Sequence, residues 1–108
     1  MIKEKESDIQ TAICDYLSLK KYFFWRQNTS PTVQITGDKW HFRRMSKYAM
    51  KGIPDIIIIK EGKFIGLEVK TSVGVISQNQ KEFKFGCENA GGEYYIVKSI
   101  DDVTKLGL

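Results

Sequence analysis

The most informative run of the chain is Gly52-Ile53-Pro54-Asp55-Ile56-Ile57-Ile58-Ile59-Lys60-Glu61-Gly62-Lys63-Phe64-Ile65-Gly66-Leu67-Glu68-Val69-Lys70. The four consecutive isoleucines at 56–59 are β-branched and apolar on both alternating faces, which predicts a strand buried on both sides. Residues 64–70 predict a second strand. Glu61-Gly62 between them predicts a two-residue turn, because glycine takes positive φ at little cost. The run therefore predicts a tight β-hairpin.

The predicted hairpin brings acidic side chains together at its open end. With a two-residue turn, Lys60 pairs with Lys63, and counting outward places Asp55 opposite Glu68. Facing side chains have Cβ atoms roughly 4.5–5.5 Å apart, where like charges repel. Lys70 lies two residues beyond Glu68 and so shares its face. A loop of another length would shift this pairing.

Two facing carboxylates favour a positive charge between them. Mg²⁺ takes oxygen ligands, often one or two carboxylates, with waters and phosphate oxygens completing its shell. The lysine could then position or deprotonate a water, or stabilise charge that develops on a phosphate. The alternative is a purely structural Asp–Lys–Glu salt-bridge cluster at a strand end.

Composition predicts one small domain over residues 1–108, with 42% hydrophobic and 28% charged residues. The net charge of +4 favours an anionic partner. We expect no membrane partner and a cytoplasmic location, since the sequence has no bilayer-length apolar run and its charged N-terminus lacks a secretory pattern. Cys14 and Cys87 are expected to be reduced thiols.

Residues 4–20 predict an amphipathic helix. Its apolar face is formed at helical spacing by Ile9, Ala12, Ile13, Tyr16 and Leu17. Glu6 lies over that face, where burying a carboxylate costs free energy unless its charge is compensated. Either Glu6 suits the helix dipole in the first turn, or it is a third acidic group aimed at the Asp55–Glu68 pair.

Residues 22–28 predict an aromatic strand packed in the core against the first helix. Arg26 in this strand could reach a phosphate, or be an ordinary solvated or paired charge. Residues 29–32 predict a loop.

A basic segment precedes the hairpin. Residues 32–36 and 39–42 predict a short hairpin of their own, with Gly37-Asp38 at the turn. Residues 39–51 interleave basic and aromatic side chains, a pattern suited to phosphates and unpaired bases; the alternative is a surface loop. His41 receives no catalytic role. The candidate DNA-binding residues are Lys39, Arg43, Arg44, Lys47 and Lys51, together with Arg26.

After a loop at 71–76, Ser77 and Gln80 match a capping box that opens a second helix. Gln80 also faces the core side near the strand that carries Lys70, where it could orient a water or a phosphate; the two roles are compatible. Gly91-Gly92 ends this helix. Residues 93–98 then predict a strand, and Ser99 caps a short last helix.

The predicted order is helix, strand, insert, strand, strand, helix, strand, helix, an α/β fold with a mixed sheet. Pro54-Asp55 followed by Glu68-Val69-Lys70 resembles the signature of the PD-(D/E)XK nucleases, whose restriction-endonuclease-like core has the order αβββαβ. Within them the chain is most similar to the VRR-NUC domain, the virus-type replication-repair nucleases, and more distantly to archaeal Holliday-junction resolvases. The further matching pieces are Glu6, Gly52, Ser77 with Gln80, and Ala90-Gly91-Gly92 before Tyr94-Tyr95-Ile96-Val97. The small size resembles the stand-alone phage or bacterial form, and the basic insert departs from the minimal core.

The resemblance implies Mg²⁺- or Mn²⁺-dependent hydrolysis of DNA phosphodiesters, often by a homodimer acting on branched DNA such as a Holliday junction during replication, repair or recombination. It implies that Asp55, Glu68 and the Val69 carbonyl hold the metal, and that Glu6 acts through water or a second ion. Lys70 and Gln80 would align the attacking water. Two other functions remain open: a nucleic-acid-binding module without catalysis, and a subunit of a larger repair complex.

Overall fold

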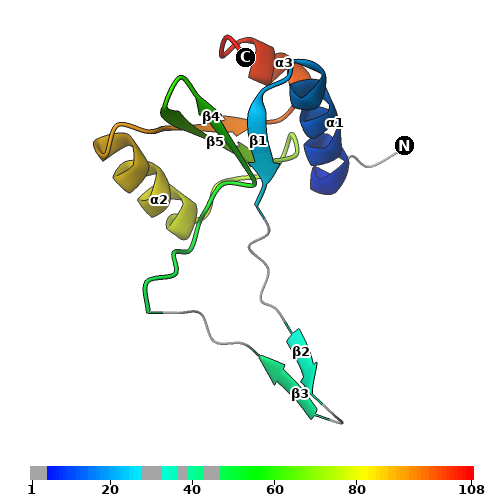
Figure 1. The fold of residues 1–108 in the computed structure, drawn as a ribbon, viewed down its shortest axis with the longest axis vertical. Helices are drawn as coiled ribbons and strands as arrows, with labels where there is room; N and C mark the ends of the chain where they lie inside the picture. The colour runs from blue at the N-terminus through cyan, green and yellow to red at the C-terminus, as the bar shows by residue number, and fades with distance from the viewer. Residues whose placement is uncertain (1–4, 28–32, 37–38, 43–46) are drawn as a thin grey trace.

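The protein is described by a computed structural model that covers residues 5–27, 33–36, 39–42 and 47–108. Figure 1 shows a central sheet with α1 and α2 on opposite sides of it. The elements are α1 (Glu6–Leu19), β1 (Phe23–Arg26), β2 (Val33–Thr36), β3 (Lys39–Phe42), β4 (Ile56–Lys60), β5 (Lys63–Val69), α2 (Gln78–Asn89), β6 (Glu93–Val97) and α3 (Ile100–Thr104). This order is the predicted one.

The hairpin forms with the predicted register. β4 pairs antiparallel with β5, from Lys60 opposite Lys63 to Ile56 opposite Leu67. Glu61 and Gly62 have φ of 53° and 76°, the two positive values that a type I′ turn requires. Continued by one residue, this register places Asp55 opposite Glu68.

The four-stranded sheet has the order β1-β4-β5-β6. β1 and β4 are antiparallel, as are β4 and β5, whereas β5 and β6 are parallel. The parallel pair is joined through α2, because parallel neighbours need a crossover connection. The mixed sheet and the helix–strand order confirm the predicted α/β architecture.

The main core lies between the sheet and α1. Ile9, Ile13 and Leu17 of α1 are buried, as the apolar spacing predicted. They pack with one face of the sheet and with the C-terminal segment, through Ile56, Ile58, Ile65, Leu67, Val69, Val97, Val103 and Leu108. Cys14 and Cys87 are free thiols. In the described residues, every helix is too short or too polar to traverse a lipid bilayer.

α2 lies against the other face of the sheet. The Phe83 ring centroid is 6.4 Å from that of Phe64 and 5.9 Å from that of Tyr94. Ser77 caps α2 as predicted, and the glycine that follows the helix, Gly91, has a φ of 92°. No residue of α2 is fully buried, so this helix covers its face of the sheet only in part.

The aromatic strand departs from prediction. Tyr22 and Phe24 pack against the core, whereas Phe23 and Trp25 are exposed. The expected core packing therefore holds for one face of the strand and not for the other. The reason is that β1 is an edge strand, and alternation turns Phe23 and Trp25 to the face that α1 does not cover.

The basic insert contains the predicted hairpin. β2 and β3 form a separate two-stranded antiparallel sheet, with Thr36 paired to Lys39. The expected turn residues Gly37 and Asp38, and the expected loop at 29–32, lie outside the described residues.

Candidate active site

The segment before β4 is fixed by two close backbone approaches. Gly52 has a φ of 78°, and a Cβ there would lie 2.2 Å from the backbone oxygen of Asn79 at the start of α2. Pro54 packs on Gly66, since a Cβ at Gly66 would lie 2.5 Å from Pro54 Cγ. Glycine is thus required at both places, and the segment is held between α2 and β5 with Asp55 at the strand end.

Asp55 is tied to both neighbouring strands. Its Oδ2 accepts a hydrogen bond from the backbone N–H of Val69 at 2.8 Å. Its backbone carbonyl accepts one from the N–H of Gln27 at 2.7 Å. The bond from Gln27 extends the β1–β4 pairing by one residue, and the bond from Val69 holds the carboxylate against β5 beside Glu68.

Glu68 is a buried acid, with only 3% of its surface exposed. The Tyr94 hydroxyl donates a hydrogen bond to its Oε1 at 3.3 Å. The pKa of Glu68 is raised to about 8, first by burial and then by a hydrogen bond with Asp55 and the charge of Asp55, while Lys70 and Tyr94 oppose the rise. The two carboxylates therefore share a site that is short of positive charge.

Lys70 follows β5 and belongs to the same cluster. Its backbone N–H donates to the Val97 carbonyl at 3.0 Å. A Cβ at Gly74 would lie 3.2 Å from Lys70 Cβ, so the loop that follows Lys70 packs against the base of the lysine side chain. Its Nζ lies 4.0 Å from Glu6 Oε1, with the side chains 15% and 46% exposed. Lys70 is thus held between Glu68 and the start of α1.

Glu6 faces Lys70 rather than joining the two carboxylates. Across residues 5–27, 33–36, 39–42 and 47–108, no group of three or more His, Cys, Asp or Glu side chains is arranged to hold a metal ion. The acidic part of the candidate site therefore consists of Asp55 and Glu68, and Glu6 reaches it through an ion pair with Lys70.

Gln80 takes part in the helix cap, as its sequence spacing predicted. Its Oε1 accepts from the Ser77 N–H at 2.8 Å, and its own N–H donates to Ser77 Oγ at 3.2 Å. A Cβ at Gly52 would lie 2.8 Å from the backbone nitrogen of Gln80. The backbone at the start of α2 thus lies next to the segment that leads to Asp55, while the Gln80 side-chain oxygen is engaged in the cap.

The candidate DNA-binding residues are spread over the molecule. Lys47 and Lys51 are exposed, and Lys47 Nζ lies 5.6 Å from the centroid of the Tyr48 ring. Lys39 begins β3, and Arg43 and Arg44 lie outside the described residues.

Arg26 lies on the face opposite Asp55. It pairs in register with Ile56, and its Nε donates to Gln10 Oε1 of α1 at 2.8 Å. Arg26 therefore forms a contact that holds α1 to the edge strand.

Tyr94 is a site residue to which sequence reasoning gave no role. It reaches Glu68 because the parallel pairing places Tyr94 beside Gly66, and Ile96 beside Glu68. Since Gly66 has no side chain, the tyrosine ring can lie across it toward the acid. The Tyr94-Tyr95 pair marked a strand in the sequence, but the register with β5 is not a local property.

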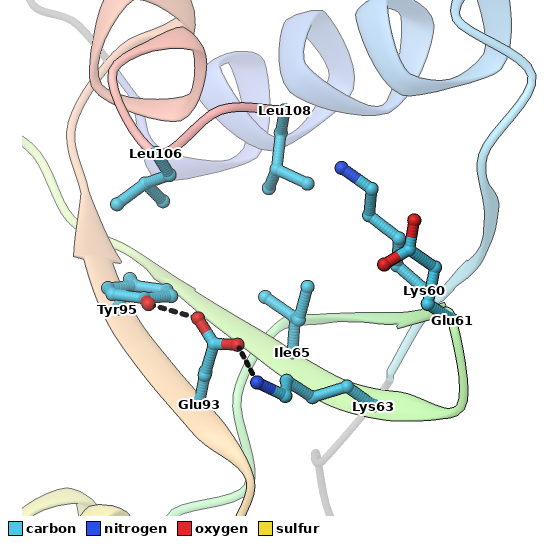
Figure 2. A pocket seen from close by; sticks show the side chains of 8 residues that line it. All are labelled: Lys60, Glu61, Lys63, Ile65, Glu93, Tyr95, Leu106 and Leu108. Carbon is cyan, nitrogen blue, oxygen red and sulfur yellow. Dashed lines mark hydrogen bonds and ion pairs between the residues drawn. The ribbon is translucent and has the colours of Figure 1, made fainter.

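A hollow of about 220 Å³ lies at the turn end of the hairpin, the opposite end from Asp55 (Figure 2). Glu93 there accepts from the Tyr95 hydroxyl and forms an ion pair with Lys63 at 3.3 Å. The hydrogen bond with Tyr95 first, and then Lys63, lowers the pKa of Glu93. Its acid is thus already paired, in contrast with the Asp55–Glu68 site.

Comparison with solved structures identifies the fold. One, described as "VRR_NUC domain", aligns over 96% of this chain and 95% of its own, with a TM-score of 0.64 and 19% identity. Another, "VRR_NUC domain protein", aligns over 98% of this chain and 87% of its own, with a TM-score of 0.71 and 16% identity. No protein-family model matches the sequence, and neither does any curated protein. The chain therefore has the restriction-endonuclease-like fold of VRR-NUC domains, as its sequence motifs predicted.

Proposed function

We propose that this protein is a metal-dependent nuclease that hydrolyses phosphodiester bonds in DNA. The observation that carries the proposal is the convergence of Asp55, Glu68 and Lys70 at one end of the β4–β5 hairpin. The likeness of the fold to VRR-NUC domains supports a nuclease function.

The donor set fits a hard divalent cation. Asp55 and Glu68 supply carboxylate oxygens, the ligands that Mg²⁺ and Mn²⁺ favour. The N–H and C=O of one strand residue point to the same side, so the Val69 N–H bond to Asp55 directs the Val69 carbonyl toward that side as well. The raised pKa of Glu68 marks a buried carboxylate whose charge is not offset. Asp55, Glu68 and the Val69 carbonyl would hold the ion, with waters and a substrate phosphate completing its shell.

A bound Mg²⁺ or Mn²⁺ would polarise the phosphate and lower the pKa of a coordinated water. Lys70 would orient the attacking water and stabilise negative charge on the phosphate. Glu6 holds the Lys70 ammonium group in place from α1. Gln80 fixes the start of α2 against Gly52, and a direct contact with the water or the phosphate stays a prediction.

The substrate we propose is DNA, and branched DNA in particular. The net charge of +4 and the exposed Lys47 and Lys51 suit a polyanion. The resemblance to replication-repair nucleases and Holliday-junction resolvases supports a branched substrate and a homodimer.

The test is cleavage of labelled four-way-junction, flap, single-stranded and duplex DNA in Mg²⁺, Mn²⁺ or EDTA. We expect metal-dependent cleavage by the wild type, none in EDTA, and none by Lys70→Ala. The preferred substrate would separate a resolvase from a flap nuclease. Salt-dependent binding of every substrate without cleavage would contradict the proposal and favour a binding module.

A further inference from the structure

Two exposed aromatic side chains lie on the face of the sheet that carries the candidate active site. Phe23 is 71% exposed and Trp25 is 40% exposed. Phe23 pairs directly with Ile59, which is also exposed. Directly paired residues share a face, so the three side chains form one continuous patch, here called the β1 patch. Isolated apolar residues are common on surfaces, but a contiguous patch is typical of an interaction site.

The β1 patch is continuous with the Asp55 site. Trp25 pairs with Ile57, and the bond from Gln27 N–H to the Asp55 carbonyl continues that register by two residues. Trp25 and Asp55 are therefore diagonal neighbours on one face, roughly 7–8 Å apart. A single nucleotide can span such a separation.

The Trp25 ring is held in position while a face stays open. Its Nε1 donates to Gln27 Oε1 at 2.9 Å, and Gln27 is itself bonded to Asp55 through its backbone. The Phe23 ring lies 6.2 Å away at an interplanar angle of 77°. Edge-to-face rings do not cover one another as stacked rings do. The indole is thus oriented toward the acidic end of the sheet and can accept a flat partner.

We propose that Trp25, supported by Phe23, stacks on an unpaired base of the DNA next to the phosphodiester held at Asp55 and Glu68. The proposal rests on the proposed nuclease function and adds a determinant of substrate choice. Stacking on an aromatic ring tolerates any base but needs an exposed base face. Bases inside a duplex are already stacked, so Trp25 selects single-stranded segments such as flaps and junction openings.

Binding in EDTA tests the proposal without cleavage. The probes are a labelled oligothymidylate and a blunt duplex of equal length. We expect Trp25→Ala to weaken oligothymidylate binding about 5- to 150-fold, the effect of losing one stacked base, and to leave duplex binding nearly unchanged. Trp25→Phe retains a ring and should keep most of the affinity. Phe85→Ala is the matched control, because Phe85 is another aromatic, 70% exposed, on α2.

A second readout reports on the ring itself. The chain has two tryptophans, so in a Trp40→Phe background Trp25 is the sole indole. We expect oligothymidylate to quench its fluorescence and the duplex to quench it far less. Equal quenching by both probes, or no quenching, would overturn the proposal.

The outcomes separate this proposal from the nuclease assignment. Stacking without cleavage under any metal contradicts the nuclease alone, whereas metal-dependent cleavage with no change in Trp25→Ala contradicts stacking alone. A third result would also overturn the stacking proposal. If the wild type sediments as a dimer, Trp25→Ala sediments as a monomer, and binding of both probes changes equally, a second copy of the chain covers the β1 patch.

Discussion

The backbone N–H of Val69 donates a hydrogen bond to Asp55 Oδ2 at 2.8 Å. This contact joins Pro54-Asp55 to Glu68-Val69-Lys70, the two pieces of the nuclease-like sequence signature. It fixes the Asp55 carboxylate against the strand that carries the other two groups. One Asp55 oxygen thus has a structural role at the site.

Gly52→Ala should destabilise the protein more than Gly62→Ala. Both glycines have positive φ, of 78° and 76°, which costs an alanine about 1–2 kcal/mol. Only at Gly52 would the new Cβ also clash, 2.2 Å from the Asn79 oxygen, whereas Gly62 has open space. Chemical denaturation would measure the two free energies of unfolding. Equal losses would contradict the close packing of this segment on α2.

Tyr94→Phe should weaken metal binding and leave the fold intact. The lost hydroxyl donates to Glu68 and favours its charged form, and removing such a supporting group typically costs about 10–100-fold in metal affinity. The Mn²⁺ concentration for half-maximal cleavage measures this. Tyr95→Phe is the control, since the Tyr95 hydroxyl bonds Glu93 at the far end of the hairpin. An effect as large in the control would contradict the role of Tyr94.

The metal-free protein should lose stability as pH rises. The pKa of Glu68 is about 8 in the folded protein against an ordinary value of 4.5, so the folded state keeps a proton that the unfolded state releases. The stability that the Glu68 proton contributes is fully present below about pH 4.5 and is lost progressively up to about pH 8. Thermal melting in EDTA would show this as a difference between wild type and Glu68→Gln.

The same melting comparison also tests metal binding. Adding Mg²⁺ or Mn²⁺ at pH 8 should raise the wild-type Tm and affect Glu68→Gln less, because a ligand that binds the folded state stabilises it. If Glu68→Gln follows the wild-type pH profile in EDTA, Glu68 is not the titrating group.

Glu6→Gln should reduce cleavage less than Lys70→Ala. The 4.0 Å ion pair is partly exposed, so its loss should change the free energy of unfolding by less than about 1 kcal/mol. Lys70→Ala removes the ammonium group that we propose orients the attacking water. Single-turnover rates compare the two variants, with Asp8→Asn as a control acid in the same helix turn. A Glu6→Gln defect equal to that of Lys70→Ala would assign Glu6 to the metal.

The hairpin was predictable because its signals are local. Four isoleucines set the strand, and Glu61-Gly62 set a two-residue turn. Register then followed by counting, and it placed Asp55 opposite Glu68 without any tertiary information. The Ser77–Gln80 cap was predictable for the same reason.

The contacts that the sequence did not reveal depend on residues far apart in the chain. Tyr94 reaches Glu68 through the register of parallel strands joined by a helix. Phe23 and Trp25 occur in a strand of buried-type composition, and only its position at the sheet edge exposes them. The partner of Glu6 depends on how α1 lies across the sheet. None of these is encoded by spacing along the chain.

The most direct test of the central claim is cleavage by Asp55→Asn across a Mn²⁺ titration. Asparagine keeps an oxygen that can accept from Val69 N–H, so the fold should persist, with an unchanged circular dichroism spectrum, while the negative charge at the site is lost. We predict cleavage at background level at every Mn²⁺ concentration. Cleavage at the wild-type rate by the folded variant would contradict the assignment of Asp55 and Glu68 as the metal site of a nuclease.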